Sequence, residues 1–391
     1  MTTARDSILI AAISGRALAR AADGAGYVPL VVDFFADMDT QALVPALIQL
    51  QDLARGFRWG SLEAALEMLA AHAPSPPLGL VYGSGFEDRP DILAQISKRW
   101  PLLGNDPATV SAVNDPAHFF AALETHAIPH PETRLDRPAD PRGWVVKRLG
   151  GAGGNHIAPA GRVRPSGKVY YQALVPGRSV SALFAANGQD ARVLGFSEQW
   201  SSPTHSKPWR FGGAVRPALL ASQAAEVMTG AVVQLAAHFH LKGLNSADFM
   251  LDGEVPRLLE INPRPGGTLD IFTNDAAPLL AVHLDAVLHE TLPDRAIVIQ
   301  DASASGIVFA PHALTIPHET VWPDWAADLP HPGERIDKER PICTVLARGR
   351  SADEARCLVD AHRDRLLAVL GASRTNASAQ EEYPARERRK R

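Results

Sequence analysis

The sequence has little of what several classes of protein require. Its 391 residues include only two cysteines, Cys343 and Cys357, which excludes a disulfide framework and favours a reducing, cytoplasmic compartment. No apolar run approaches the roughly 20 residues that span a bilayer, and the N-terminus lacks the basic region and apolar core of a signal peptide. With 39 basic and 43 acidic residues the formal net charge is -4, which argues against a general nucleic-acid binder. The chain is long enough for two or three globular domains.

The most informative stretch is residues 243–270. Two apolar runs, Ala247 to Leu251 and Leu258 to Ile261, flank the dipeptide Asp252-Gly253, a pattern that predicts a β-hairpin. Side chains alternate along a strand, so Glu260 and Asn262 point to one face and Asp248 can meet them from the partner strand. Two carboxylates and an amide oxygen are ligands that Mg²⁺ prefers.

An ordinary hairpin with a polar face is the alternative interpretation. It would place Glu260 between Leu259 and Ile261 without a charge partner, which is costly. Prolines on both sides of Arg264 end the strand and hold that arginine on a stiff loop beside the three oxygen ligands.

This stretch resembles the metal-binding end of the ATP-grasp superfamily, the carboxylate–amine and carboxylate–thiol ligases. The family pattern is an Asp on one strand and Glu-x-Asn-x-Arg after a turn, and here it reads Asp248, Glu260, Asn262 and Arg264. The resemblance implies that ATP and Mg²⁺ (or Mn²⁺) are the cofactors, and that Asp248, Glu260 and Asn262 are the metal ligands. It also implies that Arg264 stabilises negative charge during the reaction.

The first 105 residues read as a separate α/β domain. A strand from Ser7 to Ile13, a glycine turn, a helix and a strand from Tyr27 to Val32 predict a Rossmann-like parallel sheet. The turn lacks Gly-x-Gly-x-x-Gly, so the dinucleotide-binding fingerprint is absent, and Asp33 reads as a cap or loop residue. Helical spacing predicts helices over 43–53 and 61–72.

A strand from Leu78 to Tyr82 then leads into the loop Gly83 to Glu87. Because ligands bind outside the carboxyl ends of such strands, this loop is a candidate for substrate contact, with a tight turn as the alternative. ATP-grasp enzymes commonly carry a domain of this kind, the preATP-grasp domain, ahead of the ATP site.

A lysine and a glycine-rich loop lie about one hundred residues before residues 243–270. Residues 106–124 are expected to be helical, and the strand from Gly143 to Leu149 carries Lys147. The loop after it contains Gly150, Gly151, Gly153 and Gly154, whose backbone N–H groups can approach phosphate closely. The resemblance makes Lys147 the phosphate-binding lysine and the four glycines a flexible phosphate flap. An exposed strand lysine is the alternative.

The segment 172–177 matches the hinge between the two lobes of an ATP-grasp domain, which the resemblance places over residues 106–300. It lacks the glutamate that is common there, so adenine contacts fall to Gln172 and to the backbone of Ala173 and Val175. Glu198 reads as a further ligand or a strand-face charge. The loop 200–213 reads equally well as an anion-binding loop and as a solvated surface loop.

Residues 301–371 resemble the small strand–turn–helix module that follows the ATP site in some ATP-grasp enzymes. The segment 372–391 ends in Arg-Glu-Arg-Arg-Lys-Arg and is expected to be a disordered basic tail.

Taken together, the resemblance implies an ATP-dependent ligase that activates a carboxylate as an acyl phosphate and joins it to an amine, with Lys147 and Arg264 as catalytic residues. Its partners would be small-molecule carboxylate and amine substrates, with no nucleic acid and no membrane, and a homodimer is compatible with this. A looser likeness points to tyramine– or tyrosine–glutamate ligases of one-carbon cofactor biosynthesis. Two alternatives stay open: a purine-pathway or carboxylase-type enzyme, and an ATP-binding regulatory or assembly protein without catalysis.

Overall fold

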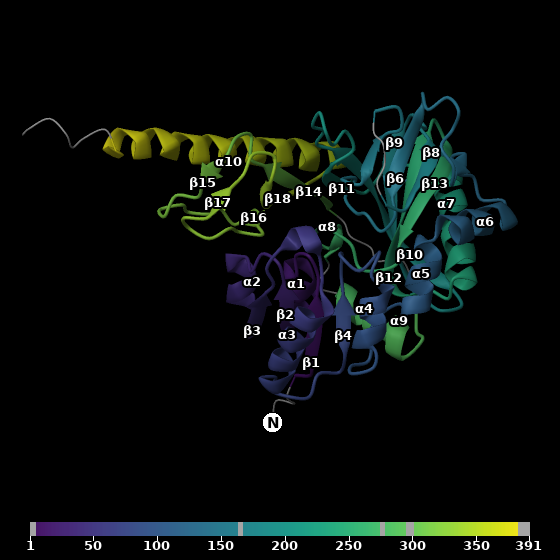
Figure 1. Ribbon diagram of the computed structural model, residues 1–391, viewed down its shortest axis with the longest axis horizontal. Coiled ribbons are helices and arrows are strands. Elements are labelled where there is room, and N and C mark those ends of the chain that lie inside the picture. The colour runs from purple at the N-terminus through teal and green to yellow at the C-terminus, as the bar shows by residue number, and fades with distance from the viewer. Residues whose placement is uncertain (1–4, 163–166, 274–277, 295–300, 382–391) are drawn as a thin grey trace, which may run out of the picture.

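The computed structural model describes residues 5–162, 167–273, 278–294 and 301–381, with side chains described to residue 371. The N-terminal part forms a four-stranded parallel sheet with helices on both faces (Figure 1). The strand order is β3-β2-β1-β4. The strands are β1 (Ser7–Ala11), β2 (Val28–Asp33), β3 (Ala46–Gln49) and β4 (Leu80–Tyr82). The helical segments are α1 (Arg16–Gly24), α2 (Met38–Leu43), η1 (Leu53–Arg55), α3 (Trp59–Ala71) and α4 (Pro90–Ile96).

Burial explains why this sheet is parallel. Every residue of β1 is buried, and its alternate side chains pack against α1 on one face and α3 on the other. A strand covered on both faces needs a continuous apolar run rather than an alternating one. Asp33 acts within this domain, because it accepts hydrogen bonds from the Gly15 and Ala36 N–H groups.

One helix prediction in the N-terminal half is wrong, and another predicted helical segment is divided in two. The segment 43–53 forms β3 and η1, because Pro45 cannot sit in a helix interior and the apolar residues after it pair with β2. The segment 106–124 is two helices, α5 (Pro107–Asn114) and α6 (Pro116–Thr125). Pro116 interrupts the run, and Asp115 caps the second helix by accepting from the Ala117 N–H at 2.8 Å.

A small antiparallel sheet follows, in the order β5-β8-β6-β7. Its strands are β5 (Thr133–Arg134), β6 (Trp144–Arg148), β7 (Ile157–Pro159) and β8 (Val169–Ala173). It forms one lobe and carries both Lys147 and the glycine loop.

The second lobe belongs to an eight-stranded sheet in the order β13-β12-β9-β10-β11-β14-β18-β16. These strands are β9 (Arg178–Asn187), β10 (Ala191–Ser201), β11 (Phe211–Arg216), β12 (Lys242–Asp252), β13 (Val255–Asn262), β14 (Ala302–Phe309), β16 (Ala326–Ala327) and β18 (Pro341–Gly349). Around it lie α7 (Ser222–His238), α8 (Leu269–Phe272), α9 (Leu279–Leu288), α10 (Ala352–Glu381) and the small pair β15 (Leu314–Thr315) and β17 (Arg335–Ile336). The expected fold class, an α/β part followed by a two-lobed α+β part, is confirmed.

Three of the C-terminal strands, β14, β16 and β18, belong to the eight-stranded sheet, and only β15 and β17 form a pair of their own. Strand β14 pairs with β11, so the sheet that carries the predicted metal hairpin continues across the boundary proposed at residue 300. Helix α10 covers β14 and β18 and projects from the body of the molecule (Figure 1). It continues to Glu381 and therefore includes part of the segment predicted as a disordered tail, while residues 382–391 lie outside the described residues. Among the described residues, no helix combines the length and the apolar character that crossing a bilayer requires.

Candidate active site

The predicted hairpin brings its three oxygen ligands together. Asp248 on β12 lies directly opposite Glu260 on β13, and Ser246 lies opposite Asn262. The register shifts between Asp248 and Phe249, a β-bulge at the carboxylate itself. The turn is the one expected from the sequence, with β12 ending at Asp252 and Gly253 at φ +60°.

Hydrogen bonds fix these side chains. Asn262 donates through Nδ2 to Asp248 Oδ2 at 3.0 Å, and Gln199 donates to Asp248 Oδ1 at 3.3 Å. Burial and the facing Glu260 carboxylate raise the pKa of Asp248 to about 6. Because the charge on Asp248 is destabilised by burial and by the facing carboxylate, a cation placed between the two would stabilise it.

Lys147 faces this set from the other lobe. Its side chain is buried, and Nζ lies 3.4 Å from Glu260 Oε2 and 6.0 Å from the centre of the Tyr170 ring. Burial alone would lower the pKa of Lys147, but Tyr170 and Glu260 outweigh it and the pKa is raised. The pKa of Glu260 is lowered, because the charge and the hydrogen bond of Lys147 outweigh the effect of burial. The interpretation of Lys147 as an exposed strand lysine is therefore wrong.

The glycine flap is held against two neighbouring segments. Gly150 and Gly154 have φ of +68° and +71°, a region that favours glycine, and a side chain there would overlap Asp88 or the Trp209 carbonyl. The Gly153 carbonyl accepts from the Phe211 N–H at 2.9 Å. Gly151 leaves room for the His156 ring. The flap therefore packs on the N-terminal domain and on the loop before β11.

His156 is a residue that the sequence did not single out. Its ring is largely buried beside Glu260, and its Nδ1 has no hydrogen-bond partner among the described residues. Burial lowers its pKa, so its neutral form is favoured. The signal in the sequence was only a histidine two residues after the glycines.

The hinge supplies fewer free groups than expected. Gln172 is buried and donates to Thr133 Oγ1 at 3.4 Å. The N–H groups of Ala173 and Leu174 donate to the carbonyls of Glu132 and Gly143, both at 2.8 Å. Adenine recognition at this strand end would therefore fall to the Ala173 carbonyl and the Val175 N–H.

Arg264 is tied to the N-terminal domain. Its Nε and Nη2 both lie 2.7 Å from Glu87 Oε1, and Nη2 donates to Asn262 Oδ1 at 3.3 Å. The other Glu87 oxygen accepts from the Gly85 N–H at 2.7 Å. The loop Gly83 to Glu87 was predicted as a substrate-contact candidate. The structure shows that its glutamate contacts Arg264.

A cavity of about 270 Å³ lies beside Arg264, between the carboxyl ends of β1 and β4 and strand β14. We call it the substrate-side cavity. Apolar side chains that include Leu18, Phe211 and Leu269 line part of it. Buried Arg16, whose Nη1 donates to Asp270 at 3.0 Å and whose Nε donates to Asp328 at 2.8 Å, closes another part. The sequence did not indicate this network, because Arg16 lies more than 250 residues before both Asp270 and Asp328.

Two other candidates, Glu198 and the loop 200–213, lie outside the group of residues around Lys147 and Glu260. Glu198 pairs with Arg178 at 2.6 Å, as expected of a strand-face charge. The loop 200–213 is shorter than predicted, because β10 extends to Ser201 and β11 begins at Phe211. Its Arg210 is buried and bonded to Ser202 and to the Glu339 carbonyl.

Residues 113–268 match the family model described as an ATP-grasp domain. Solved structures agree on the fold. The L-amino acid ligase from Bacillus licheniformis gives a TM-score of 0.69 at 14% identity, covering 93% of this chain and 98% of that one. N5-carboxyaminoimidazole ribonucleotide synthetase from Thermotoga maritima gives a TM-score of 0.64 at 13% identity, covering 92% of this chain and 98% of that one. The biotin carboxylase domain of the Hydrogenobacter thermophilus 2-oxoglutarate carboxylase, solved with MgADP, ADP and bicarbonate, gives 0.70 at 12% identity, covering 90% and 87%. No curated protein sequence matches the chain.

Proposed function

Because the chain carries an ATP-grasp domain within an ATP-grasp fold, we propose that it is an ATP- and Mg²⁺-dependent ligase. It activates a small-molecule carboxylate as an acyl phosphate, joins the acyl group to an amine and releases ADP. One observation carries this proposal: buried Lys147 of one lobe faces Asp248, Glu260 and Asn262 of the other, with Arg264 beside them.

The nucleotide would enter between the two lobes. The cavity there, between the flap and β13, is only about 40 Å³, which is room for little more than one water molecule. Binding of the triphosphate would therefore separate Lys147 from Glu260. Phosphate oxygens would replace the carboxylate as the partner of Lys147, and Glu260 would be free to help hold a cation. Lys147 then contacts phosphate oxygens, and the flap N–H groups cover them, which neutralises charge that develops during transfer.

The residues present fit a divalent cation of the magnesium type. The described residues contain no group of three or more His, Cys, Asp and Glu side chains that could hold a metal. Two carboxylates and one amide suit Mg²⁺, which usually keeps water and phosphate oxygens in its shell. Asn262 Oδ1 now accepts from Arg264, so this amide would have to turn toward the ion. When bound, the ion neutralises phosphate charge.

Arg264 connects the nucleotide site with the substrate-side cavity. Glu87 holds its guanidinium in place, so it can stabilise negative charge where the carboxylate meets the γ-phosphate. A carboxylate oxygen attacks the γ-phosphorus and ADP leaves. The amine nitrogen then attacks the acyl carbon, phosphate leaves, and the amine loses its proton. The substrate-side cavity has room for a molecule of about amino-acid size.

The substrates define the finer proposal. An amino acid or related small carboxylate joined to an amine, as in cofactor biosynthesis, is our first choice. The likeness to a biotin carboxylase domain and to N5-carboxyaminoimidazole ribonucleotide synthetase favours a second candidate, an ATP-grasp enzyme of carboxylase or purine-pathway type. Bicarbonate therefore belongs among the carboxylates tested.

The test is ADP release with MgATP against a matrix of carboxylates and amines, starting with glutamate paired with tyramine and with tyrosine. ADP release that needs one carboxylate and one amine, with the joined product seen by mass spectrometry, supports the ligase. ATP binding without turnover across the matrix would instead favour the ATP-binding regulatory or assembly protein.

A further inference from the structure

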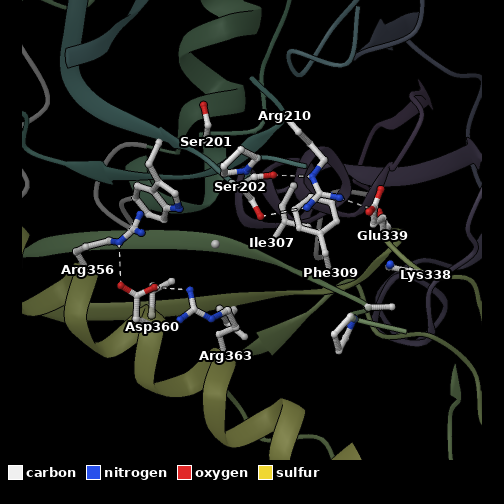
Figure 2. Close-up of a pocket in the computed structure, with 18 residues that line it drawn as sticks. Ser201, Ser202, Arg210, Ile307, Phe309, Lys338, Glu339, Arg356, Asp360 and Arg363 are labelled. Carbon is white, nitrogen blue, oxygen red and sulfur yellow. Dashed lines mark hydrogen bonds and ion pairs between the residues drawn. The ribbon is translucent and has the colours of Figure 1, made fainter. Parts of the chain in front are cut away.

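A second and larger cavity, of about 470 Å³, lies outside the proposed active site. It is enclosed by the end of β10 and the loop after it, by β14 and by helix α10 (Figure 2). Gly306 and Ile307 of β14 line both this cavity and the substrate-side cavity, so β14 lies between the two. Its volume falls in the range of small-molecule sites.

Basic side chains outnumber acidic ones in its lining. The four basic residues are Arg210, Lys338, Arg356 and Arg363, and the two acidic residues are Glu339 and Asp360. Asp360 is shared between two guanidiniums, 3.2 Å from Arg356 Nε and 2.7 Å from Arg363 Nη1. Arg356 Nη1 has no hydrogen-bond partner among the described residues, and Lys338 has no ion pair there. Arg363 also pairs with Asp364 at 3.0 Å, so the positive charge that is left without an acidic partner lies at Arg356 Nη1 and Lys338.

Arg356 is held in place by an aromatic ring. Its guanidinium lies 3.3 Å from the centre of the Trp200 ring, a cation–π contact. Side chains at Gly213 or Gly306 would overlap Trp200 or its neighbour Val359, so glycines at these positions make the space that the indole occupies. Burial lowers the pKa of Arg356, the sign of a cation that has lost water without gaining a full set of partners.

The opposite wall combines the apolar side chains of Ile307 and Phe309 with Arg210, and it is continuous with the loop on which the flap packs. Arg210 packs over Phe309 at 3.5 Å and donates to the Ser202 carbonyl at 2.9 Å (Figure 2). Ser202 and Arg210 line the cavity, whereas the next residue, Phe211, donates to the Gly153 carbonyl of the flap. A ligand in this cavity would therefore contact the loop on which the flap is packed.

We propose that this cavity, formed by residues 200–212, 306–311 and helix α10, binds a small organic anion that has an apolar body and a phosphate or carboxylate group. The anionic group lies among Arg356, Arg363 and Lys338, and the apolar body lies against Phe309 and Ile307. Through the loop 202–210, the bound anion changes how tightly the flap closes on a nucleotide. Only this last link rests on the proposed function.

Binding is measured by isothermal titration calorimetry with saturating MgADP, so that the nucleotide site is filled. Phenyl phosphate and benzoate share a ring and a negative charge, and benzylamine has the same ring with a positive charge. We expect saturable 1:1 binding of phenyl phosphate, benzoate or both, and none of benzylamine. Preference for one anion identifies the group as phosphate or carboxylate. Absence of binding by both anions, or equal binding of benzylamine, would overturn the proposal.

Variants locate the site. Arg356→Ala removes the central guanidinium and should weaken anion binding at least about tenfold, the effect of one charge-assisted hydrogen bond. Lys338→Ala removes an exposed side chain without disturbing packing and should weaken binding severalfold, which keeps the test decisive if Arg356→Ala does not fold. The matched control is Arg350→Ala, since Arg350 lies just before α10, is almost fully exposed and pairs with Glu354. Equal binding by Lys338→Ala and Arg350→Ala would overturn this location.

The link to the flap has its own readout. Affinities coupled between two sites change by the same factor in both directions. ADP affinity should therefore change severalfold when phenyl phosphate is saturating, and Lys338→Ala should reduce that change. An unaltered ADP affinity would contradict the proposed effect of the bound anion on the flap. Neither measurement needs turnover, so an inactive protein that still binds the anion would contradict the ligase and leave this site standing.

Discussion

The two sides of Arg264 are built in different ways. On the nucleotide side, Asp248, Glu260 and Asn262 come from one hairpin and sit within 15 consecutive residues, 248–262. On the other side, the substrate-side cavity takes its lining from segments between residues 12 and 344. The three predicted metal ligands form a short local motif because one hairpin fixes their geometry, although Lys147 reaches them from the other lobe. A substrate pocket is assembled only when distant segments meet, so its residues carry no local pattern.

The largest effect is expected on the nucleotide side, from Glu260→Gln. Loss of the charge that faces Lys147 and the metal position should lower ATP turnover by about 10³-fold, with the fold retained. ADP release measures the ATP turnover, and circular dichroism shows whether the fold is retained. The control is Asp252→Asn, an exposed carboxylate in the turn of the same hairpin. Turnover near the wild-type rate would contradict the metal assignment.

Lys147→Ala should raise the KM for ATP on the order of 10- to 100-fold, because a buried charge-assisted contact to phosphate is lost. Initial rates over a range of ATP concentrations test this. Lys168→Ala, at an exposed lysine of the same lobe, should leave the KM unchanged. If both variants behave alike, Lys147 does not belong to the nucleotide site.

Glu87→Gln tests whether the two sides meet at Arg264. The variant loosens the guanidinium without removing it, so turnover should fall on the order of tenfold while ADP affinity is kept. Steady-state rates and calorimetric ADP binding separate the two effects. Glu67→Gln, at an exposed glutamate that pairs with Arg99, is the control. A fall in ADP affinity equal to the fall in rate would place Glu87 in the nucleotide site instead.

The smallest effect is expected at Asp37, a buried carboxyl group near Asp328 of the substrate-side cavity. Burial and the neighbouring Asp328, Asp33 and Asp39 raise the pKa of Asp37 to about 9. A carboxyl group with a raised folded pKa favours folding in its protonated form, so wild-type stability is lost as pH rises from about 4 toward 9. Asp37→Asn should therefore raise the melting temperature by about 2–4 °C at pH 8 and change it little at pH 4. Differential scanning calorimetry at pH 4 and pH 8 measures both melting temperatures. Equal shifts of the melting temperature at the two pH values would exclude titration of Asp37 as the cause.

The same contrast explains which features the sequence could predict. The hairpin was readable because Asp252-Gly253 and the alternation of side chains determine its register locally. Lys147 was readable from its strand and the glycines after it. The contact of Glu87 with Arg264 was not, because it joins residues 177 positions apart. The strand β3 was missed because a short apolar run fits a helix or a strand, and only pairing with β2 decides between them.

The pairing of β11 with β14 has a consequence for how the protein is made. During synthesis the chain emerges N-terminus first, so the strands of the hairpin β12–β13 leave the ribosome well before residues 302–349. Until β14 arrives, β11 presents an open edge of unpaired backbone groups, the feature by which sheets associate wrongly with other chains. A ribosome-bound chain truncated near residue 300 should therefore be prone to aggregation, and the sheet reaches its native edge only once β14, β18 and β16 have been added.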